Sequence, residues 1–145
     1  MSQSQYRTLR QRAAFDQCDP AGILFSGHYP LLAHRAIEEF VVHMGFSWGE
    51  WFQHPQYAIP LRHLEVNYLS PLRAGELYDW TVSLGDLGET SVPFKVEVRS
   101  VQDSSVVCAQ IQSVHVFLDT KLKQKTAIPL EFRHKLEPFV SSSKL

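Results

Sequence analysis

Residues 18–29 contain the side chains best suited to chemistry, in the order CDPAGILFSGHY. Asp19 lies among Pro and Gly residues that are typical of a loop, and the loop leads into an apolar pattern with helical spacing. A helix start presents unpaired backbone N–H groups and about half a positive charge, which can stabilise the oxyanion that develops at a carbonyl under attack. A carboxylate beside these donors can attack the carbonyl or deprotonate a water. From the spacing alone, a turn or capping role for Asp19 is an equal alternative.

The same segment resembles the active-site motif of the 4-hydroxybenzoyl-CoA thioesterases and their acyl-CoA relatives. That motif has Thr or Cys before the Asp, then a Gly, a β-branched residue, an apolar residue, an aromatic residue and a Tyr at set spacings. This chain fills those positions with Cys18, Asp19, Gly22, Ile23, Leu24, Phe25 and Tyr29. Residues 58–61 and 65–68, followed by Ser70 and Pro71, resemble the family's second strand, and residues 58–61 also resemble its 1,4-dihydroxy-2-naphthoyl-CoA branch. The resemblance extends over about residues 6–135.

The resemblance implies a single hotdog fold and the hydrolysis of an acyl-CoA or aroyl-CoA to the free acid and CoA. Asp19 corresponds to the family's catalytic Asp, acting as nucleophile or general base. The implied substrate-binding residues are Gly22, Ser26, Gly27 and Tyr29, with the backbone N–H groups at the helix start polarising the thioester carbonyl. The resemblance also implies tetramers of hotdog dimers, in which each site draws on two chains. No cofactor is expected, because CoA is part of the substrate.

Three positions depart from the family's pattern, and one of them, Ala13 where the family usually has Ile or Val, bears on strand packing only. Relatives often carry His or Tyr where this chain has Ser26, so a side-chain contribution there would be lost while the backbone N–H would remain. An acidic residue is more common at the position of His34, which bears on acyl preference.

Two other functions fit the same fold. A non-catalytic acyl-CoA or acyl-carrier binding module would be indicated by loss of the catalytic Asp, which this chain retains as Asp19. A hotdog dehydratase would use a His with an acidic partner, for which His28 and Glu38 are the candidates.

Several other reactive residues also have an ordinary structural interpretation. Asp16 could raise the pKa of Asp19 but is better explained as a loop residue. Cys18 is better explained by packing than as a nucleophile, because no base that would lower its pKa lies nearby. His63 and Glu65 share a strand face and could line a pocket, although a polar surface explains them better. The seven His show no metal-binding spacing, so no zinc site is expected.

The phosphates of CoA need cations at the mouth of a pocket. The sequence offers several without favouring one: Arg62, Arg73, Lys95, Arg99, Lys121, Lys123 and Lys125. The last three alternate and could share a face, but a solvated strand end explains them equally well.

The sequence predicts an α+β fold that positions the candidate site residues. Apolar residues at helical spacing predict a long central helix over residues 30–44, with Pro30 in its first turn and Gly45 just past its end. The spacing of Ser47 and Glu50 predicts a capping box and a second, shorter helix. Alternating apolar residues predict strands around residues 6–15, 64–68, 80–84 and 92–98. The continuous apolar run at the start of residues 106–119 predicts a fifth strand that is buried on both faces. The later strands follow one another through short turns, so we expect a five-stranded antiparallel sheet wrapped around the long helix. One domain over residues 1–145 is expected, with 136–145 as a loose tail.

Composition narrows the class of function. The 145-residue chain has a net charge of −1 and no basic stripe, which argues against nucleic-acid binding. No run approaches the roughly 20 apolar residues that span a bilayer, so no membrane association is expected. Two Cys and no apolar leader favour the cytoplasm. One helix covers only part of a five-stranded sheet, so the other face and the strand edges need a partner, and we expect a homo-oligomer, a dimer of dimers.

Overall fold

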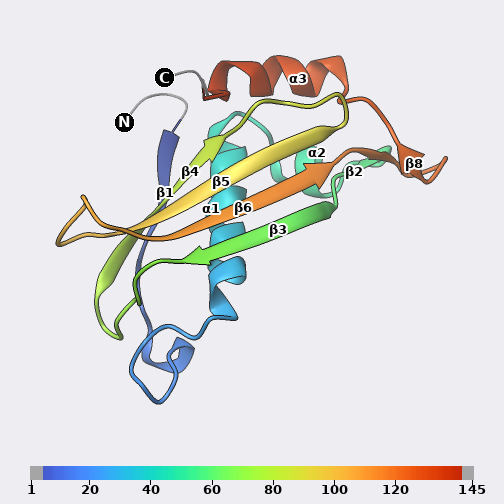
Figure 1. Cartoon of the computed structure of the whole chain (residues 1–145). Helices are drawn as coiled ribbons and strands as arrows, with labels where there is room; N and C mark the ends of the chain where they lie inside the picture. Colours follow the sequence, from blue (N-terminus) through green and yellow to red (C-terminus); the bar gives the residue numbers. More distant parts are fainter. Residues whose placement is uncertain (1–4, 142–145) are drawn as a thin grey trace.

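In the computed structural model, which describes residues 5–141, a five-stranded antiparallel sheet carries one helix across its face (Figure 1). The sheet has the order β1-β4-β5-β6-β3, and the helix is α1 (His28–His43). The strands are β1 (Gln5–Arg12), β3 (Leu61–Tyr68), β4 (Leu77–Leu84), β5 (Ser91–Ser100) and β6 (Val107–Val116). The expected α+β architecture is confirmed. With 16 residues, the helix is of moderate length rather than long.

Short elements complete the fold. A second, small sheet has the order β2-β7-β8, with strands β2 (Tyr57–Ala58), β7 (Leu118–Asp119) and β8 (Gln124–Lys125). The remaining helices are α2 (Trp48–Phe52), α3 (Leu130–Leu136) and two 3₁₀ turns, Phe15–Gln17 and Glu137–Phe139. The predicted capping box of α2 is confirmed, since the Ser47 and Glu50 side chains each accept the other residue's amide. Within residues 5–141, no helix has the length and apolar character needed to cross a membrane.

Helix α1 packs through the apolar face that its spacing predicts. All seven residues of that face are buried, namely Leu32, Ala33, Ala36, Ile37, Phe40, Val41 and Met44. The Phe40 ring meets Phe94 of β5 edge-on, with ring centroids 6.4 Å apart. The helix begins at His28, two residues earlier than expected, which leaves Pro30 in the first turn, where a missing N–H is tolerated. This packing fixes the N-terminal end of α1, and the loop before it, against the sheet.

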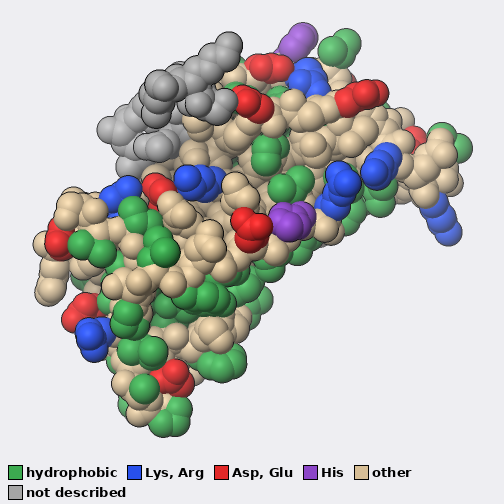
Figure 2. All heavy atoms as spheres, in the orientation of Figure 1, with side chains coloured by type: hydrophobic (Ala, Val, Ile, Leu, Met, Phe, Trp, Pro, Cys, Tyr) green, Lys and Arg blue, Asp and Glu red, His purple; other side chains and the backbone are tan. Residues whose placement is uncertain are grey.

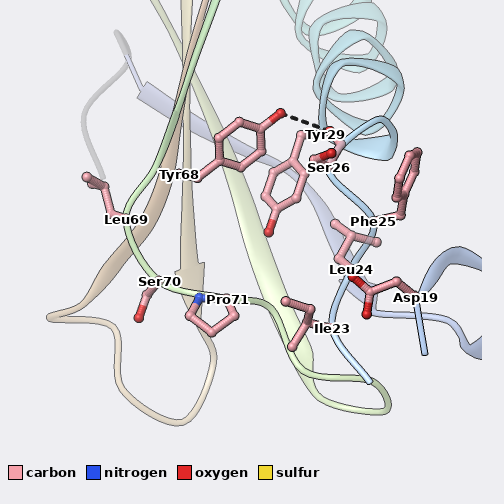
Figure 3. A pocket seen from close by; sticks show the side chains of 10 residues that line it. All are labelled: Asp19, Ile23, Leu24, Phe25, Ser26, Tyr29, Tyr68, Leu69, Ser70 and Pro71. Carbon is pink, nitrogen blue, oxygen red and sulfur yellow. Dashed lines mark hydrogen bonds between the residues drawn. The ribbon is translucent and has the colours of Figure 1, made fainter. Parts of the chain in front are cut away.

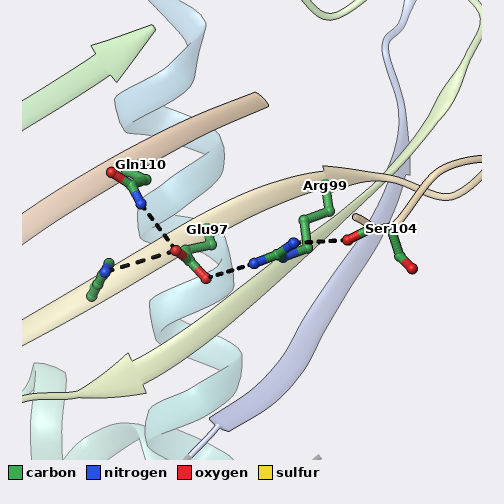
Figure 4. Close-up of polar contacts among 5 residues, drawn as sticks. Glu97, Arg99, Ser104 and Gln110 are labelled. Carbon is green, nitrogen blue, oxygen red and sulfur yellow. Dashed lines mark hydrogen bonds and ion pairs between the residues drawn. The ribbon is translucent and has the colours of Figure 1, made fainter. Parts of the chain in front are cut away.

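The opposite face of the sheet is polar. Glu97 accepts a hydrogen bond from Gln110 Nε2 at 3.0 Å and lies 3.5 Å from Arg99 Nη2 and 3.7 Å from Lys95 Nζ (Figure 4). Arg99 also donates to the Ser104 carbonyl at 2.7 Å. Figure 2 shows charged side chains spread over this side of the molecule. The polar groups of this face pair with one another, so the edge of β3, which pairs with no other strand among the described residues, is the stronger reason to expect a partner chain.

Strand β3 does not pair with β4, the next long strand along the chain. It pairs with β6, so that β3 and β1 form the two edges of the sheet. The short connection expected between β3 and β4, with its turn at residues 73–76, instead crosses the ends of β5 and β6 as segment 69–76. Its start is held by the amides of Leu69 and Ser70, which both donate to the Cys108 carbonyl at 2.9 Å. This crossing brings the end of β3 close to the start of α1.

Two predicted strand boundaries are wrong. The first strand ends at Arg12, and Phe15 lies in a 3₁₀ turn with 92% of its surface exposed. The apolar run 106–119 divides at Phe117 into β6 and β7. Phe117 is fully buried, and its amide donates to the Thr90 carbonyl at 2.9 Å, one position beyond the pairing of Ser91 with Val116.

The loose tail expected over residues 136–145 is structured as far as Ser141. Leu136 ends α3 and is fully buried in the core. The Ser141 amide donates to the Leu84 carbonyl at 2.7 Å. Burial of an apolar side chain and a backbone bond to β4 therefore hold this segment, and residues 142–145 lie outside the described part of the chain.

A buried serine joins α1 to β6. Ser113 is fully buried, and its Oγ lies 3.1 Å from His34 Nε2 and 2.8 Å from His115 Nε2. His115 Nδ1 lies 3.3 Å from the Ile59 carbonyl. Burial lowers the pKa of both His34 and His115 from the ordinary value, so their neutral forms are favoured. The Ser113 hydroxyl therefore satisfies two neutral rings that face each other across the helix–sheet interface.

Replacing Ser113 by Ala should lower the free energy of unfolding by about 1–3 kcal/mol, because buried ring nitrogens lose their hydrogen-bond partner. Ser83→Ala is the matched control, since Ser83 lies on the polar side of β4. That variant should differ from the wild type by no more than about 0.5 kcal/mol. Urea unfolding followed by circular dichroism measures both changes. Equal stability of Ser113→Ala and the wild type would contradict the bridging role.

Candidate active site

Residues 17–25 fold into a tight hairpin with Asp19 at one corner. The Phe25 amide donates to the Gln17 carbonyl and the Asp19 amide donates to the Ile23 carbonyl, both at 2.9 Å. The second arm of the hairpin runs directly into α1. The hairpin therefore fixes Asp19 beside the start of the helix.

The turn of this hairpin follows from its four residues, Asp19-Pro20-Ala21-Gly22. The Gly22 amide closes it by donating to the Asp19 carbonyl at 2.9 Å. Asp is favoured at the first position of such a turn and Pro at the second. Gly22 has a φ of +79°, a conformation that costs other residues. The order of residues in the motif thus builds the turn that presents the carboxylate.

One carboxylate oxygen of Asp19 supports the turn. Oδ1 accepts the Ala21 amide at 2.9 Å, an arrangement that Asp commonly makes with the residue two positions on. Among residues 5–141, no donor contacts Oδ2. That oxygen is therefore available to a molecule bound beside the loop.

The backbone between the hairpin and α1 presents two amides in succession. The Phe25 carbonyl accepts the His28 amide at 3.0 Å, and the Ser26 carbonyl accepts the Tyr29 amide at 3.4 Å. The N–H groups of Ser26 and Gly27 donate to no acceptor in the described part of the chain, and no side chain caps the helix start. This end of α1 therefore keeps free donors and a partial positive charge, which is an arrangement that stabilises an oxyanion.

Asp19 and Ser26 share one open cavity of about 470 Å³ (Figure 3). Three segments form it: the hairpin with the helix start, the first turn of α1, and the end of β3 with the loop that follows. The lining residues are Asp19, Ile23, Leu24, Phe25, Ser26, Tyr29, Tyr68, Leu69, Ser70 and Pro71. Most of these side chains are apolar or aromatic, and only a few polar groups converge on the space. Such a lining suits a small molecule with a flat, apolar portion.

The structure brings the predicted site residues together in part. Asp19, Ser26 and Tyr29 line the cavity. Gly22 and Gly27 are not among the lining residues: Gly22 closes the turn and Gly27 precedes the helix. Tyr29 is only 3% exposed, and burial raises the pKa of its hydroxyl. It therefore forms a neutral wall of the cavity.

The end of β3 supplies four lining residues that the sequence did not single out for the site. They are Tyr68, Leu69, Ser70 and Pro71. The Tyr68 hydroxyl donates to the Ser26 carbonyl at 2.9 Å, between positions 42 residues apart. The Ser70-Pro71 pair marked the end of a strand, but only the placement of β3 next to β6 brings that end to the helix start.

Cys18 and Asp16 lie outside the cavity lining. Burial, and then the negative charges of Asp19 and Asp16, raise the pKa of the Cys18 thiol. The thiol form is a poor nucleophile, which agrees with a packing role. Asp16 is exposed in a 3₁₀ turn. Among residues 5–141, no group of three or more His, Cys, Asp or Glu side chains is arranged to hold a metal ion.

The His28 and Glu38 pair considered for a dehydratase is not assembled within one chain. The two residues are ten positions apart in α1, which corresponds to about 15 Å of helix rise. His28 packs edge-on against Phe25, with ring centroids 5.9 Å apart, while burial raises the pKa of Glu38. His63 and Glu65 are both exposed, with 3.5 Å between Nε2 and Oε1, and do not line the cavity.

The candidate cations for CoA lie in different parts of the fold. Lys95 and Arg99 pair with Glu97 on the polar face of the sheet. Arg73 is exposed, and its backbone bridges to Ile23 of the cavity lining. The others are exposed elsewhere, Arg62 on β3 and Lys121, Lys123 and Lys125 around β7 and β8. Arg73 is therefore the candidate with a direct backbone connection to the cavity.

Proteins of known sequence and structure resemble this chain over most of its length. Residues 13–136 match the family described as the thioesterase-like superfamily. A 1,4-dihydroxy-2-naphthoyl-CoA hydrolase of Crocosphaera subtropica is 24% identical over 85% of this chain and 90% of the relative. One from Nostoc punctiforme is 26% identical over 94% of this chain and 88% of the relative. The crystal structure of a 1,4-dihydroxy-2-naphthoyl-CoA thioesterase from Synechocystis is 16% identical, with a TM-score of 0.79 over 91% of this chain and 93% of that chain. The expected hotdog fold is confirmed by this likeness.

Proposed function

Because this chain belongs to the thioesterase-like superfamily, we propose that it hydrolyses an aroyl-CoA to the free acid and CoA in the cavity beside α1. One observation carries the proposal. Asp19 and Ser26 line the same cavity. Among the described residues, one carboxylate oxygen of Asp19 accepts no hydrogen bond, and the Ser26 and Gly27 amides at the helix start donate none. The names of the relatives and of the similar solved structure support the same class of reaction.

In the proposed reaction, the thioester carbonyl oxygen accepts hydrogen bonds from the Ser26 and Gly27 amides at the positive end of α1. As a nucleophile, Asp19 adds to the carbonyl carbon, the C–S bond breaks, and the CoA thiolate takes up a proton. Water then hydrolyses the mixed anhydride and restores the carboxylate. As a general base, Asp19 instead removes a proton from a water whose oxygen adds to the carbonyl carbon. The tetrahedral intermediate then collapses, the C–S bond breaks, and the CoA thiolate takes the proton back from Asp19. Either route consumes one water and needs no cofactor besides the CoA of the substrate.

The acyl group that we propose is flat and aromatic, of the 1,4-dihydroxy-2-naphthoyl class. Three rings line the cavity, those of Phe25, Tyr29 and Tyr68, and aromatic walls bind flat aromatic groups well. The names of the two relatives support the same acyl class. Arg73, whose backbone bridges to Ile23, is our candidate for a contact with the CoA phosphates.

A panel of acyl-CoA and aroyl-CoA thioesters, read by release of free thiol, tests the proposed function. We expect turnover, fastest with naphthoyl and benzoyl groups. Tight binding of the thioesters without thiol release would contradict hydrolysis and support a binding module. Loss of water from a 3-hydroxyacyl thioester, dependent on His28 and without thiol release, would contradict it in favour of a dehydratase.

The working form that we propose is a cytoplasmic homo-oligomer in which two copies pair along β3. This strand of eight residues is an edge of the sheet, and long unpaired edges readily pair with another chain. Leu61, Tyr68 and Leu69 are 43%, 52% and 59% exposed along it. Tyr68 and Leu69 also line the cavity, so a second copy would help to close the site. A dimer of dimers extends the same proposal, and two free cysteines, Cys18 and Cys108, agree with a reducing compartment.

Sedimentation velocity at micromolar concentration should give a particle of at least two 16.6 kDa chains. Leu69→Lys should shift the particle towards the monomer, because it places a charge beside the proposed strand pairing. Leu130→Lys is the matched control, since Leu130 is 72% exposed on α3, and it should leave the mass unchanged. A monomeric wild-type chain would contradict the pairing.

A further inference from the structure

Tyr68 contacts the backbone just before the start of α1. It is the last residue of β3, and its hydroxyl donates to the Ser26 carbonyl at 2.9 Å (Figure 3). Its ring stands edge-on against the buried ring of Tyr29, with centroids 4.8 Å apart and planes at 84°. Tyr29 thus supports the ring while the hydroxyl reaches the backbone before α1.

The Ser26 carbonyl lacks the hydrogen bond that a helix would ordinarily offer it. The donor four positions on would be residue 30, but Pro30 has no N–H. The backbone donor that remains is the Tyr29 amide, at 3.4 Å, which is longer than the usual N–H···O distance. The Tyr68 hydroxyl, at 2.9 Å, is therefore the closer of the two donors that hold this carbonyl.

Fixing that carbonyl also fixes an amide. In a planar trans peptide the C=O and N–H point in opposite directions, and the Ser26 C=O shares its peptide with the Gly27 N–H. The preceding peptide, which carries the Ser26 N–H, is fixed in the same way, because the Phe25 carbonyl accepts the His28 amide at 3.0 Å. One of the two free amides is thus oriented by the helix backbone, and the other by a side chain from β3.

We propose that Tyr68 is a positioning residue that aims the Gly27 N–H at the thioester carbonyl. The inference rests on the proposed hydrolysis. In this role Tyr68 acts through the Ser26–Gly27 peptide and does not touch the reacting atoms. The oxyanion develops only as the reaction proceeds, so the orientation of its donors affects kcat more than KM. The Tyr68 ring also lines the cavity, and a Phe at this position retains that contact.

Tyr68→Phe removes only the hydroxyl and tests the inference. We expect kcat to fall about 10-fold, less than the roughly 10²–10³-fold loss that follows removal of an oxyanion donor itself. KM should stay within about two-fold of the wild type, because ground-state binding is retained. Tyr57→Phe is the matched control, since Tyr57 lies on β2 outside the cavity lining, and it should leave both constants unchanged. Replacing Tyr68 by 4-aminophenylalanine restores a donor at the same place and should recover most of the lost kcat.

Backbone ¹⁵N relaxation measures how rigidly the Gly27 N–H is held when no substrate is present. The order parameter of the Gly27 N–H should be lower in Tyr68→Phe than in the wild type, and unchanged in Tyr57→Phe. An active wild type with unchanged kcat or unchanged Gly27 order in Tyr68→Phe would overturn the positioning role and leave the hydrolysis standing. A wild type that releases no thiol from any thioester would instead overturn the proposed function, together with the catalytic part assigned to Tyr68.

Discussion

Replacing Asp19 by Asn should reduce kcat for thioester hydrolysis by about 10²–10⁴-fold, the usual contribution of a carboxylate that transfers a proton. The amide has no anionic oxygen that can attack the carbonyl or accept a proton from water. The turn should persist, because an Asn oxygen can accept the Ala21 amide as Asp19 Oδ1 does at 2.9 Å and Asn suits the same position. Free-thiol release at saturating aroyl-CoA measures kcat, and circular dichroism checks the fold.

Asp16→Asn is the matched control for this prediction. It makes the same change three residues upstream, in an exposed side chain outside the cavity lining. Its kcat should stay within about two-fold of the wild type. Turnover by Asp19→Asn close to that of the wild type would remove Asp19 from the mechanism. Equal losses in the two variants would show that the loop's charge, and not the Asp19 carboxylate, is what the reaction needs.

Replacing Phe40 by Ala should lower the free energy of unfolding by about 3–5 kcal/mol, the usual cost of emptying an aromatic site in a core. Phe40 is fully buried in the last turn of α1, and its ring meets Phe94 of the sheet. Domains of ordinary stability have a free energy of unfolding of about 5–15 kcal/mol, so the Phe40→Ala variant should retain only a small free energy of unfolding. Urea denaturation followed by tryptophan fluorescence gives the difference.

Val42→Ala is the control for that prediction, because Val42 lies two positions on in the same helix and is 50% exposed. It should change the free energy of unfolding by no more than about 0.5 kcal/mol. A loss below about 1 kcal/mol for Phe40→Ala would contradict the packing of α1 on the sheet.

The local features of the site follow from residues close together in the chain, and these were predictable. Asp, Pro and Gly in order specify the turn that presents Asp19, because each suits its own position. The apolar spacing specifies the buried face of α1, down to Met44 at its end. The helix start then lies next to the turn because few residues separate them. The carboxylate and the free amides are therefore neighbours for reasons visible in the sequence.

The far wall of the cavity depends on pairing between distant strands and was not predictable. Short turns after Tyr68 suggested neighbouring strands, but β3 lies beyond β6 at the edge of the sheet. Only this order brings Tyr68 to Ser26, 42 positions earlier. The hydrogen bond between Gln110 and Glu97 joins two strands and was not predictable for the same reason, whereas Lys95 and Arg99 lie on the same strand as Glu97. Single-sequence patterns carry the period of each strand but not the identity of its neighbours.

A crystal structure of Asp19→Asn with an intact aroyl-CoA tests the central claim most directly. The carbonyl oxygen should lie about 2.7–3.1 Å from the amide nitrogens of Ser26 and Gly27, with the Asn side chain facing the carbonyl carbon. The described chain also has a smaller cavity of about 310 Å³ between α2 and α3, lined in part by Phe46 and Phe132. A thioester bound there, or anywhere that leaves the Ser26 and Gly27 amides without contact to the carbonyl, would contradict the account.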